Sequence, residues 1–85
     1  MDRYLVVSKH TDRDCVKALK AVESIGYITH FEWGCKDGDH TGYVIIEADS
    51  HEEAKMCVPS YERPGATVIR LNKFSVDDVK QMKDH

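Results

Sequence analysis

The chain has 85 residues, of which 41% are hydrophobic and 32% are charged, and its formal net charge is −3 at pH 7. This length predicts one domain over residues 1–85, without room for a second core. Lys and Arg form no run beyond isolated pairs, which argues against a nucleic-acid partner and against a polybasic membrane anchor. The longest wholly apolar run, Val44–Ile46, is far too short to span a bilayer.

The first ten residues, MDRYLVVSKH, contain too short an apolar run for a secretory signal peptide. The three cysteines include no Cys-x-x-Cys pair, so the usual zinc and thioredoxin patterns are missing. We therefore expect reduced thiols in a cytoplasmic protein. The sequence contains no nucleotide or flavin motif, and we expect no cofactor.

The first half of the chain predicts a strand, a helix and a second strand. Arg3–Lys9 is β-branched and aromatic, which is typical of a strand. Thr11-Asp12 can cap the following helix, and Gly26 suits the left-handed residue that ends it. Apolar residues at helical spacing form the stripe Cys15, Val16, Ala18, Leu19, Val22 and Ile25. Tyr27–Trp33 is the second expected strand.

The second half predicts two more strands and two helices. Gly42–Ala48 is the third strand, joined to the second by the glycine-rich hairpin GCKDGDHT. Ser50 and Glu53 form a capping box for a helix that Pro59 stops. After the Pro64-Gly65 turn, Ala66–Leu71 is the fourth strand. A last helix begins at Ser75 with Asp78, and its inward side is expected to carry Val76, Val79 and Met82.

This element order, βαββαβ with a short C-terminal helix, predicts a ferredoxin-like α+β sandwich with a four-stranded antiparallel sheet. Two helices cover one face of such a sheet and leave the other face open. Alternation along each strand assigns the side chains to the two faces. The helix side is expected to receive Leu5, Val7, Phe31, Trp33, Val44, Ile46, Ile69 and Leu71. The open side is expected to carry Tyr4, Val6, Ser8, His10, Ile28, His30, Glu32, Tyr43, Ile45, Glu47, Val68, Arg70 and Asn72.

The segment after the hairpin reads YVIIEADSHEEA and is followed by Pro-Ser-Tyr and then ATVIRL. Over Gly42 to Phe74, about 40% of the chain, this outline resembles YCII-like proteins and GYD-type members of the dimeric α/β-barrel group. The resemblance implies a homodimer whose two sheets close around a cavity. YCII-like proteins pair a histidine with an aspartate in an Asp-Pro-Tyr segment. This chain has Val58-Pro59-Ser60-Tyr61, so that dyad does not carry over.

The open face of the expected dimer predicts a pocket for a small polar or anionic organic molecule. Its lining is expected to be Ser8, His10, His30, Glu32, Tyr43, Arg70 and Asn72. His30, or His10, could move a proton, with Glu32 as its support. Arg70 would hold an anionic group such as a carboxylate or enolate. Because the sequence has no nucleotide or flavin motif, a cofactor-free isomerisation or oxygenation is the form that an activity would take. The alternative is a dimerisation or regulatory module in which these polar residues pair with one another and no reaction occurs.

The stretch THFEWGCKDGDHTGY, residues 29–43, has a second interpretation. The topology brings His10 towards the hairpin that holds Cys35 and His40, and with an Asp these are suitable transition-metal ligands. Because no recognised ligand spacing occurs, we expect a polar turn and assign no metal ligand. Cys35 with His40 as nucleophile and base has no motif in support. Cys15 and Cys57 are expected to be small apolar residues of the core.

Overall fold

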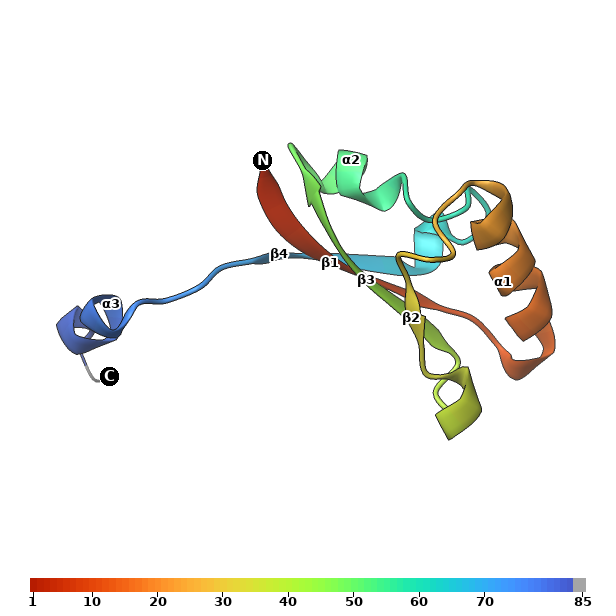
Figure 1. Cartoon of the computed structure of the whole chain (residues 1–85), viewed down its shortest axis with the longest axis horizontal. Helices are drawn as coiled ribbons and strands as arrows, with labels where there is room; N and C mark the ends of the chain where they lie inside the picture. The colour runs from red at the N-terminus through yellow and green to blue at the C-terminus, as the bar shows by residue number, and fades with distance from the viewer. Residues whose placement is uncertain (84–85) are drawn as a thin grey trace.

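A computed structural model of the chain describes residues 1–83. Its four strands form one antiparallel sheet in the order β2-β3-β1-β4 (Figure 1). The strands are β1 (Asp2–Lys9), β2 (Glu32–Trp33), β3 (Thr41–Ala48) and β4 (Ala66–Leu71). The helices are α1 (Cys15–Ser24), α2 (His51–Lys55) and α3 (Val76–Gln81). The predicted α+β class with a four-stranded antiparallel sheet is therefore confirmed. Within residues 1–83 no helix has the length and apolar character needed to cross a bilayer.

Side-chain caps fix where the helices begin. Thr11 accepts a hydrogen bond from the Asp14 backbone N–H at 3.3 Å and starts the 3₁₀ turn that leads into α1. Ser75 and Asp78 form a complete capping box at α3. Ser50 caps α2 as predicted, but the Glu53 carboxylate accepts from the backbone N–H of Asp49, one residue before the expected partner.

The core lies between the sheet and the two helices α1 and α2. Val22 of α1 and Ala54 of α2 are fully buried against the same side of the sheet. The sheet contributes Tyr4, Val6, Val44 and Ala48, and Phe31, Cys57 and Val58 complete the buried cluster. Full burial of a side chain such as Val or Phe contributes about 1.5–3 kcal/mol, so this compact set carries much of the stability of so short a chain. Cys57 is a core residue as predicted, and burial raises the pKa of its thiol to about 11.

The side chains of β1 and β4 point to the opposite faces of the sheet from those predicted, whereas the side chains of β3 point as predicted. Val6 pairs with Val44 and with Val68, and residues directly opposite one another share a face. Because the Val44 side chain faces the helices, those of Val6 and Val68 face them as well. Tyr4, two residues before Val6 in the same strand, shares that face. The strand YLVVS is apolar on both sides, so its pattern does not reveal which side is inward.

The second strand is shorter than predicted. Only Glu32 and Trp33 pair with β3, because residues 27–30 form a turn closed by the His30 N–H and the Tyr27 carbonyl at 2.9 Å. The predicted sides of Phe31, Trp33 and Glu32 are correct. Ile28, which was expected on the open side, packs against the core.

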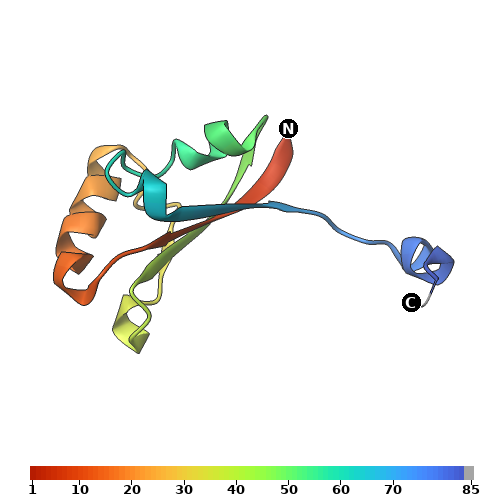
Figure 2. The ribbon, with the colours of Figure 1, turned by 180° about the vertical axis from the view of Figure 1, so that it is seen from behind.

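Helix α3 does not cover the core. The chain continues straight beyond β4, and α3 stands apart from the sheet and the other helices (Figures 1 and 2). Val76, Val79 and Met82, expected to face inward, are 72%, 56% and 54% exposed. Helix α2 is also shorter than predicted, since it ends at Lys55 rather than at Pro59.

Gly42 offers a direct test of the packing between β2 and β3. A Cβ atom at this position would lie 2.7 Å from the Trp33 ring and 3.1 Å from the Phe31 ring. We predict that Gly42→Ala lowers the free energy of unfolding by about 1–3 kcal/mol, as overpacking does in tight cores. Gly65→Ala is the control, because its Cβ would meet nothing within 4 Å. Urea denaturation should separate the two variants, and equal midpoints would contradict this packing.

Glu62 is a buried carboxylate that opposes folding at neutral pH. It is 9% exposed, and its Oε2 atom has no hydrogen-bond partner. Burial raises its pKa above the ordinary 4.5, and the Asp14 carboxylate raises it further. A pKa raised on folding means that the folded protein binds more protons than the unfolded chain, so stability falls as the pH rises from 4.5 through the folded pKa.

We therefore predict that Glu62→Gln is more stable than the original protein at neutral pH, where the amide replaces a buried charge. The difference should vanish below about pH 4, where the glutamate is protonated in both states. Thermal denaturation followed by circular dichroism at both pH values measures it. Glu52→Gln, at an exposed position of α2, is the control. A Glu62→Gln protein that is less stable at neutral pH would show that the carboxylate has a stabilising partner.

Candidate metal centre

Four side chains that can bind metals meet at one end of the sheet. They are His10, Cys15, Cys35 and His40, and one ligand atom from each lies within 4.8 Å of all the others. His10 follows β1, Cys15 is the first residue of α1, Cys35 begins a 3₁₀ turn in the hairpin, and His40 precedes β3. All four are partly buried. The cluster therefore joins three segments that are separate in the sequence.

Backbone contacts hold these segments together. The His10 N–H donates to the His40 carbonyl at 3.0 Å and continues the pairing of β1 with β3. The hairpin is tight at Gly34, where a Cβ atom would lie 2.8 Å from the Asp39 carbonyl oxygen. The left-handed φ of 85° at Gly38 lets the chain turn back towards β3. The glycines of the hairpin thus serve its backbone geometry, and that geometry places Cys35 and His40 beside one another.

Asp39 fastens the hairpin to the start of β3. Its carboxylate accepts hydrogen bonds from the Thr41 hydroxyl at 2.6 Å and from the Tyr43 phenol. These two hydrogen bonds hold the pKa of Asp39 below its usual value, and the bond to Asp39 raises the pKa of the Tyr43 phenol. Asp39 is the residue immediately before His40, so its hydrogen bonds restrict where the His40 side chain can lie.

The four side chains crowd one another at the end of the sheet. Cys35 Sγ lies 3.4 Å from His10 Nε2, and the rings of His10 and His40 are 5.7 Å apart between centroids. Burial lowers the pKa of His10, and the neighbouring His40 lowers it further. Burial likewise raises the pKa of Cys35, and the adjacent Cys15 thiol adds to that effect. The neutral form of histidine is the form that binds a metal ion, and a cation would stabilise the thiolates that burial alone disfavours.

His40 has the surroundings of a metal-binding histidine. Its Nε2 atom lies 3.3 Å from an Asp12 carboxylate oxygen, whereas its Nδ1 atom is buried without a hydrogen-bond partner. Metal-binding histidines commonly donate their second ring N–H to a carboxylate, which leaves the other nitrogen for the metal. His10 Nδ1 is also buried without a partner. Buried ring nitrogens normally find a partner. The Nδ1 atom of His40 therefore points to a missing electron-pair acceptor, whereas in His10 it is Nε2 that faces the cluster, 3.4 Å from Cys35 Sγ.

Two sulfur and two nitrogen donors match the ligand set of a structural zinc site. Zinc in such sites is tetrahedral and takes all four ligands from the protein. Tetrahedral coordination by two thiolates and two imidazoles favours zinc over the harder cations magnesium and calcium. A site with four protein ligands leaves no position for the activated water of a catalytic zinc.

The residues predicted to line an organic-ligand pocket do not lie together. Ser8 is buried on the helix side of the sheet. Arg70 also lies on that side, 3.5 Å from the Tyr4 hydroxyl and 3.7 Å from the Asp2 carboxylate. Asn72 is exposed in the segment beyond β4. His10 belongs to the cluster of sulfur and nitrogen donors at the end of the sheet.

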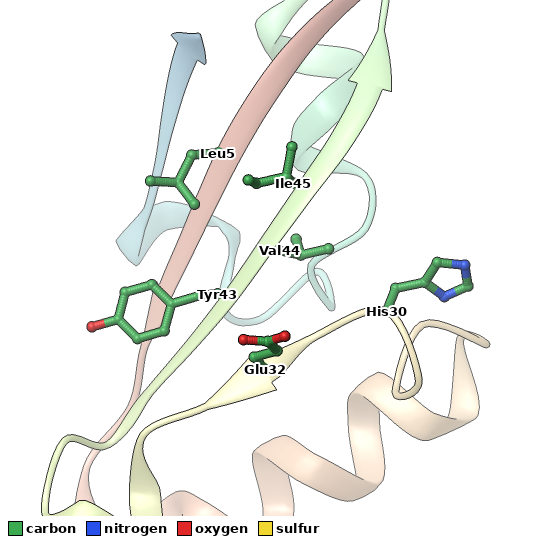
Figure 3. Close-up of a pocket in the computed structure, with 6 residues that line it drawn as sticks. All are labelled: Leu5, His30, Glu32, Tyr43, Val44 and Ile45. Atoms are coloured by element: carbon green, nitrogen blue, oxygen red, sulfur yellow. The ribbon is translucent and has the colours of Figure 1, made fainter.

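His30, Glu32 and Tyr43 do share the open side of the sheet. With Leu5, Val44 and Ile45 they line a groove of about 330 Å³ (Figure 3). The close-up shows the Glu32 carboxylate between Tyr43 and His30, with the His30 ring directed away from it. The Tyr43 phenol is already bound to Asp39. The groove thus lacks the histidine–glutamate contact that the expected acid–base role requires.

Sequence reasoning identified three of the four clustered residues and missed Cys15. It assigned Cys15 to the core because this residue fits the apolar stripe of α1. A different signal was available in the matched spacing of two pairs, His10-x₄-Cys15 and Cys35-x₄-His40. Each pair places a cysteine and a histidine on either side of a tight turn or cap, and the two pairs face one another at the end of the sheet.

Comparison with family models, with curated proteins and with solved structures finds no match to this chain. The case for a function therefore depends on the geometry and the chemistry of the four-residue cluster.

Proposed function

We propose that the protein is a zinc-binding domain in which His10, Cys15, Cys35 and His40 hold one structural Zn²⁺ ion. The observation that carries this proposal is the mutual distance of the four ligand atoms, within 4.8 Å. In a tetrahedral site with Zn–S near 2.3 Å and Zn–N near 2.0–2.1 Å, neighbouring ligand atoms are roughly 3.3–3.8 Å apart. The 3.4 Å separation of Cys35 Sγ and His10 Nε2 already falls in this range. Small side-chain rotations would complete the set.

The proposed role of the ion is to cross-link the end of the sheet. A chain of this length buries a limited fraction of its unfolded surface, and small domains commonly use metals as additional cross-links. The ion would join β1, α1 and the hairpin through ligands up to 30 residues apart in the chain. Because the unfolded chain does not present a formed site, metal-binding free energy becomes folding free energy.

The frame that carries the site is, in this proposal, a ferredoxin-like one. The sheet order β2-β3-β1-β4 and the helix between β1 and β2 support that assignment. In this frame β1 and β2 end at the same edge where β3 begins, which is why the ligands of three segments converge there.

An organic-molecule site in the groove of His30, Glu32 and Tyr43 has weaker support. Only these three of the seven residues expected to line a pocket belong to the groove, and one of the three, Tyr43, is bound to Asp39. The cluster, in contrast, brings together four donors of complementary chemistry. The geometry therefore favours a metal-binding role over the acid–base reaction.

Zinc stoichiometry and the identity of the ligands provide the first test of this proposal. Protein purified without a histidine tag should bind one equivalent of zinc, and Co²⁺ in its place should give the intense visible absorption and the sulfur-to-metal charge-transfer bands of tetrahedral thiolate coordination. Cys15→Ala and Cys35→Ala should each weaken zinc binding by at least about 100-fold, the upper end of what loss of an outer-shell partner costs. Each should also remove part of the charge-transfer intensity.

Cys57→Ala is the matched control, because Cys57 is a buried cysteine of the core outside the cluster. It should keep the zinc stoichiometry and the Co²⁺ spectrum. Zinc at 100 times its dissociation constant should raise the free energy of unfolding of the original protein by about 2.7 kcal/mol. The proposal fails if zinc binding survives loss of either clustered cysteine, or if Co²⁺ gives only the weak spectrum of an octahedral ion.

The second prediction concerns Asp12 as the carboxylate that orients His40. Asp12→Ala should weaken zinc binding by about tenfold, the lower end of the range for outer-shell carboxylates, because Asp12 itself is exposed. The Co²⁺ spectrum should keep its form, since all four ligands remain. Chelator competition measures the affinity. Asp37→Ala is the control, because Asp37 is an exposed acid of the hairpin that carries Cys35 and His40. Equal affinities of the two variants would rule out this role for Asp12.

A further inference from the structure

Two apolar surfaces of the described chain have no partner. The first, the open face, is the side of the sheet away from α1 and α2. It presents Leu5, Val7, Tyr43, Ile45, Ile69 and Leu71. Ile45 is 52% exposed and Ile69 is 45% exposed, although both lie near the middle of their strands. An apolar strip of this kind across three neighbouring strands marks an interaction surface more often than a solvated one.

The second surface is the arm, residues 72–83, which carries α3. Phe74 is 65% exposed, and Val76, Val79 and Met82 are exposed as well. Val76 and Val79 lie three residues apart on one side of α3, whereas Asp77 and Gln81 lie on the other side. The helix has six residues, and a helix this short is not stable in water without packing. Its complete capping box shows that the sequence specifies it, so the arm requires a surface to pack on.

The direction of the arm decides which surface it reaches. Figures 1 and 2 show from opposite sides that the chain leaves β4 in a straight line and carries α3 away from the body of the domain. The longest dimension of the molecule, 47 Å against 28 and 22 Å for the others, reflects this extension. Residues 72–75 form no turn or bend in the structure, so the chain does not reverse there towards its own open face.

We propose that the arm of each copy packs on the open face of a second copy, forming a homodimer by reciprocal arm exchange. Both surfaces belong to the same chain, so a two-fold axis satisfies both at once and closes the assembly. The six apolar residues of the open face are far fewer than the roughly 20–30 residues that a standard interface takes from each partner, and the twelve residues of the arm bring the surface close to that range. The exchange does not involve the metal ligands.

Sedimentation equilibrium of the full chain at micromolar concentration tests the exchange. The original protein should sediment at twice its monomer mass of 9.7 kDa. Val79→Asp in the arm and Ile45→Asp on the open face should each raise the dimer dissociation constant by about 30-fold or more, as loss of a central interface side chain does. Gln81→Asp is the matched control, because it adds the same charge to the opposite side of α3. Circular dichroism checks that every variant is folded.

A mixing experiment separates arm exchange from other dimers. A Val79→Asp chain retains an unaltered open face, and an Ile45→Asp chain retains an unaltered arm. In an equimolar mixture the arm of the second chain should therefore pack on the open face of the first and form a heterodimer. Heterodimer formation with no homodimer of either variant supports the exchange. A monomeric original protein overturns it, as does a Val79→Asp variant that dimerises as well as the original. Failure of the two variants to associate when mixed overturns it too.

Discussion

The pairing of β1 with β3 is the interaction on which the rest of the structure depends. It runs from Asp2 opposite Ala48 to Lys9 opposite Thr41, and the hydrogen bond from the His10 N–H to the His40 carbonyl extends it by one step. The register decides which side chains face the helices, because opposite residues share a face. It also sets the two histidines beside one another at the end of the sheet. A shift of one residue would turn Val6 and Tyr4 outward and would separate these histidines.

The candidate metal centre and the core occupy different parts of the sheet. The buried cluster of Tyr4, Val6 and Val44 lies in the middle of the sheet and leaves its ends to polar contacts. At the hairpin end, burial disfavours the thiolate of Cys35 and the charged form of His10. Such a group of donors costs stability when it has no partner and contributes to stability when a cation is bound. In the proposed zinc-bound form the same residues cross-link the domain, whereas without an ion they are a weak point of it.

The sequence predicts the elements of this fold better than it predicts their faces. The bounds of β4 are as predicted, and the caps at Thr11 and Ser75 are identifiable from residue type alone. Both sides of β1 are apolar, so only pairing with β3 decides which side is inward. The arm was expected to cover the core because its apolar spacing fits an inward helix side. That spacing does not indicate whether the apolar side of the helix packs on its own domain or on another molecule.

For the site, topology correctly brought His10 to Cys35 and His40, because strand ends are shared by elements distant in sequence. Cys15 was missed because one residue satisfies two patterns, the apolar stripe of α1 and the matched spacing of the ligand pairs. The sheet register separates Arg70 and Ser8 from the groove of His30 and Glu32, and a single sequence does not reveal that register.

X-ray absorption at the zinc edge tests the central claim most directly. If His10, Cys15, Cys35 and His40 hold the ion, the first coordination shell will contain two sulfur atoms at about 2.3 Å and two nitrogen atoms at about 2.0–2.1 Å. A shell of oxygen and nitrogen without sulfur, or one expanded by water to five or six ligands, would contradict the assignment of a closed structural zinc site.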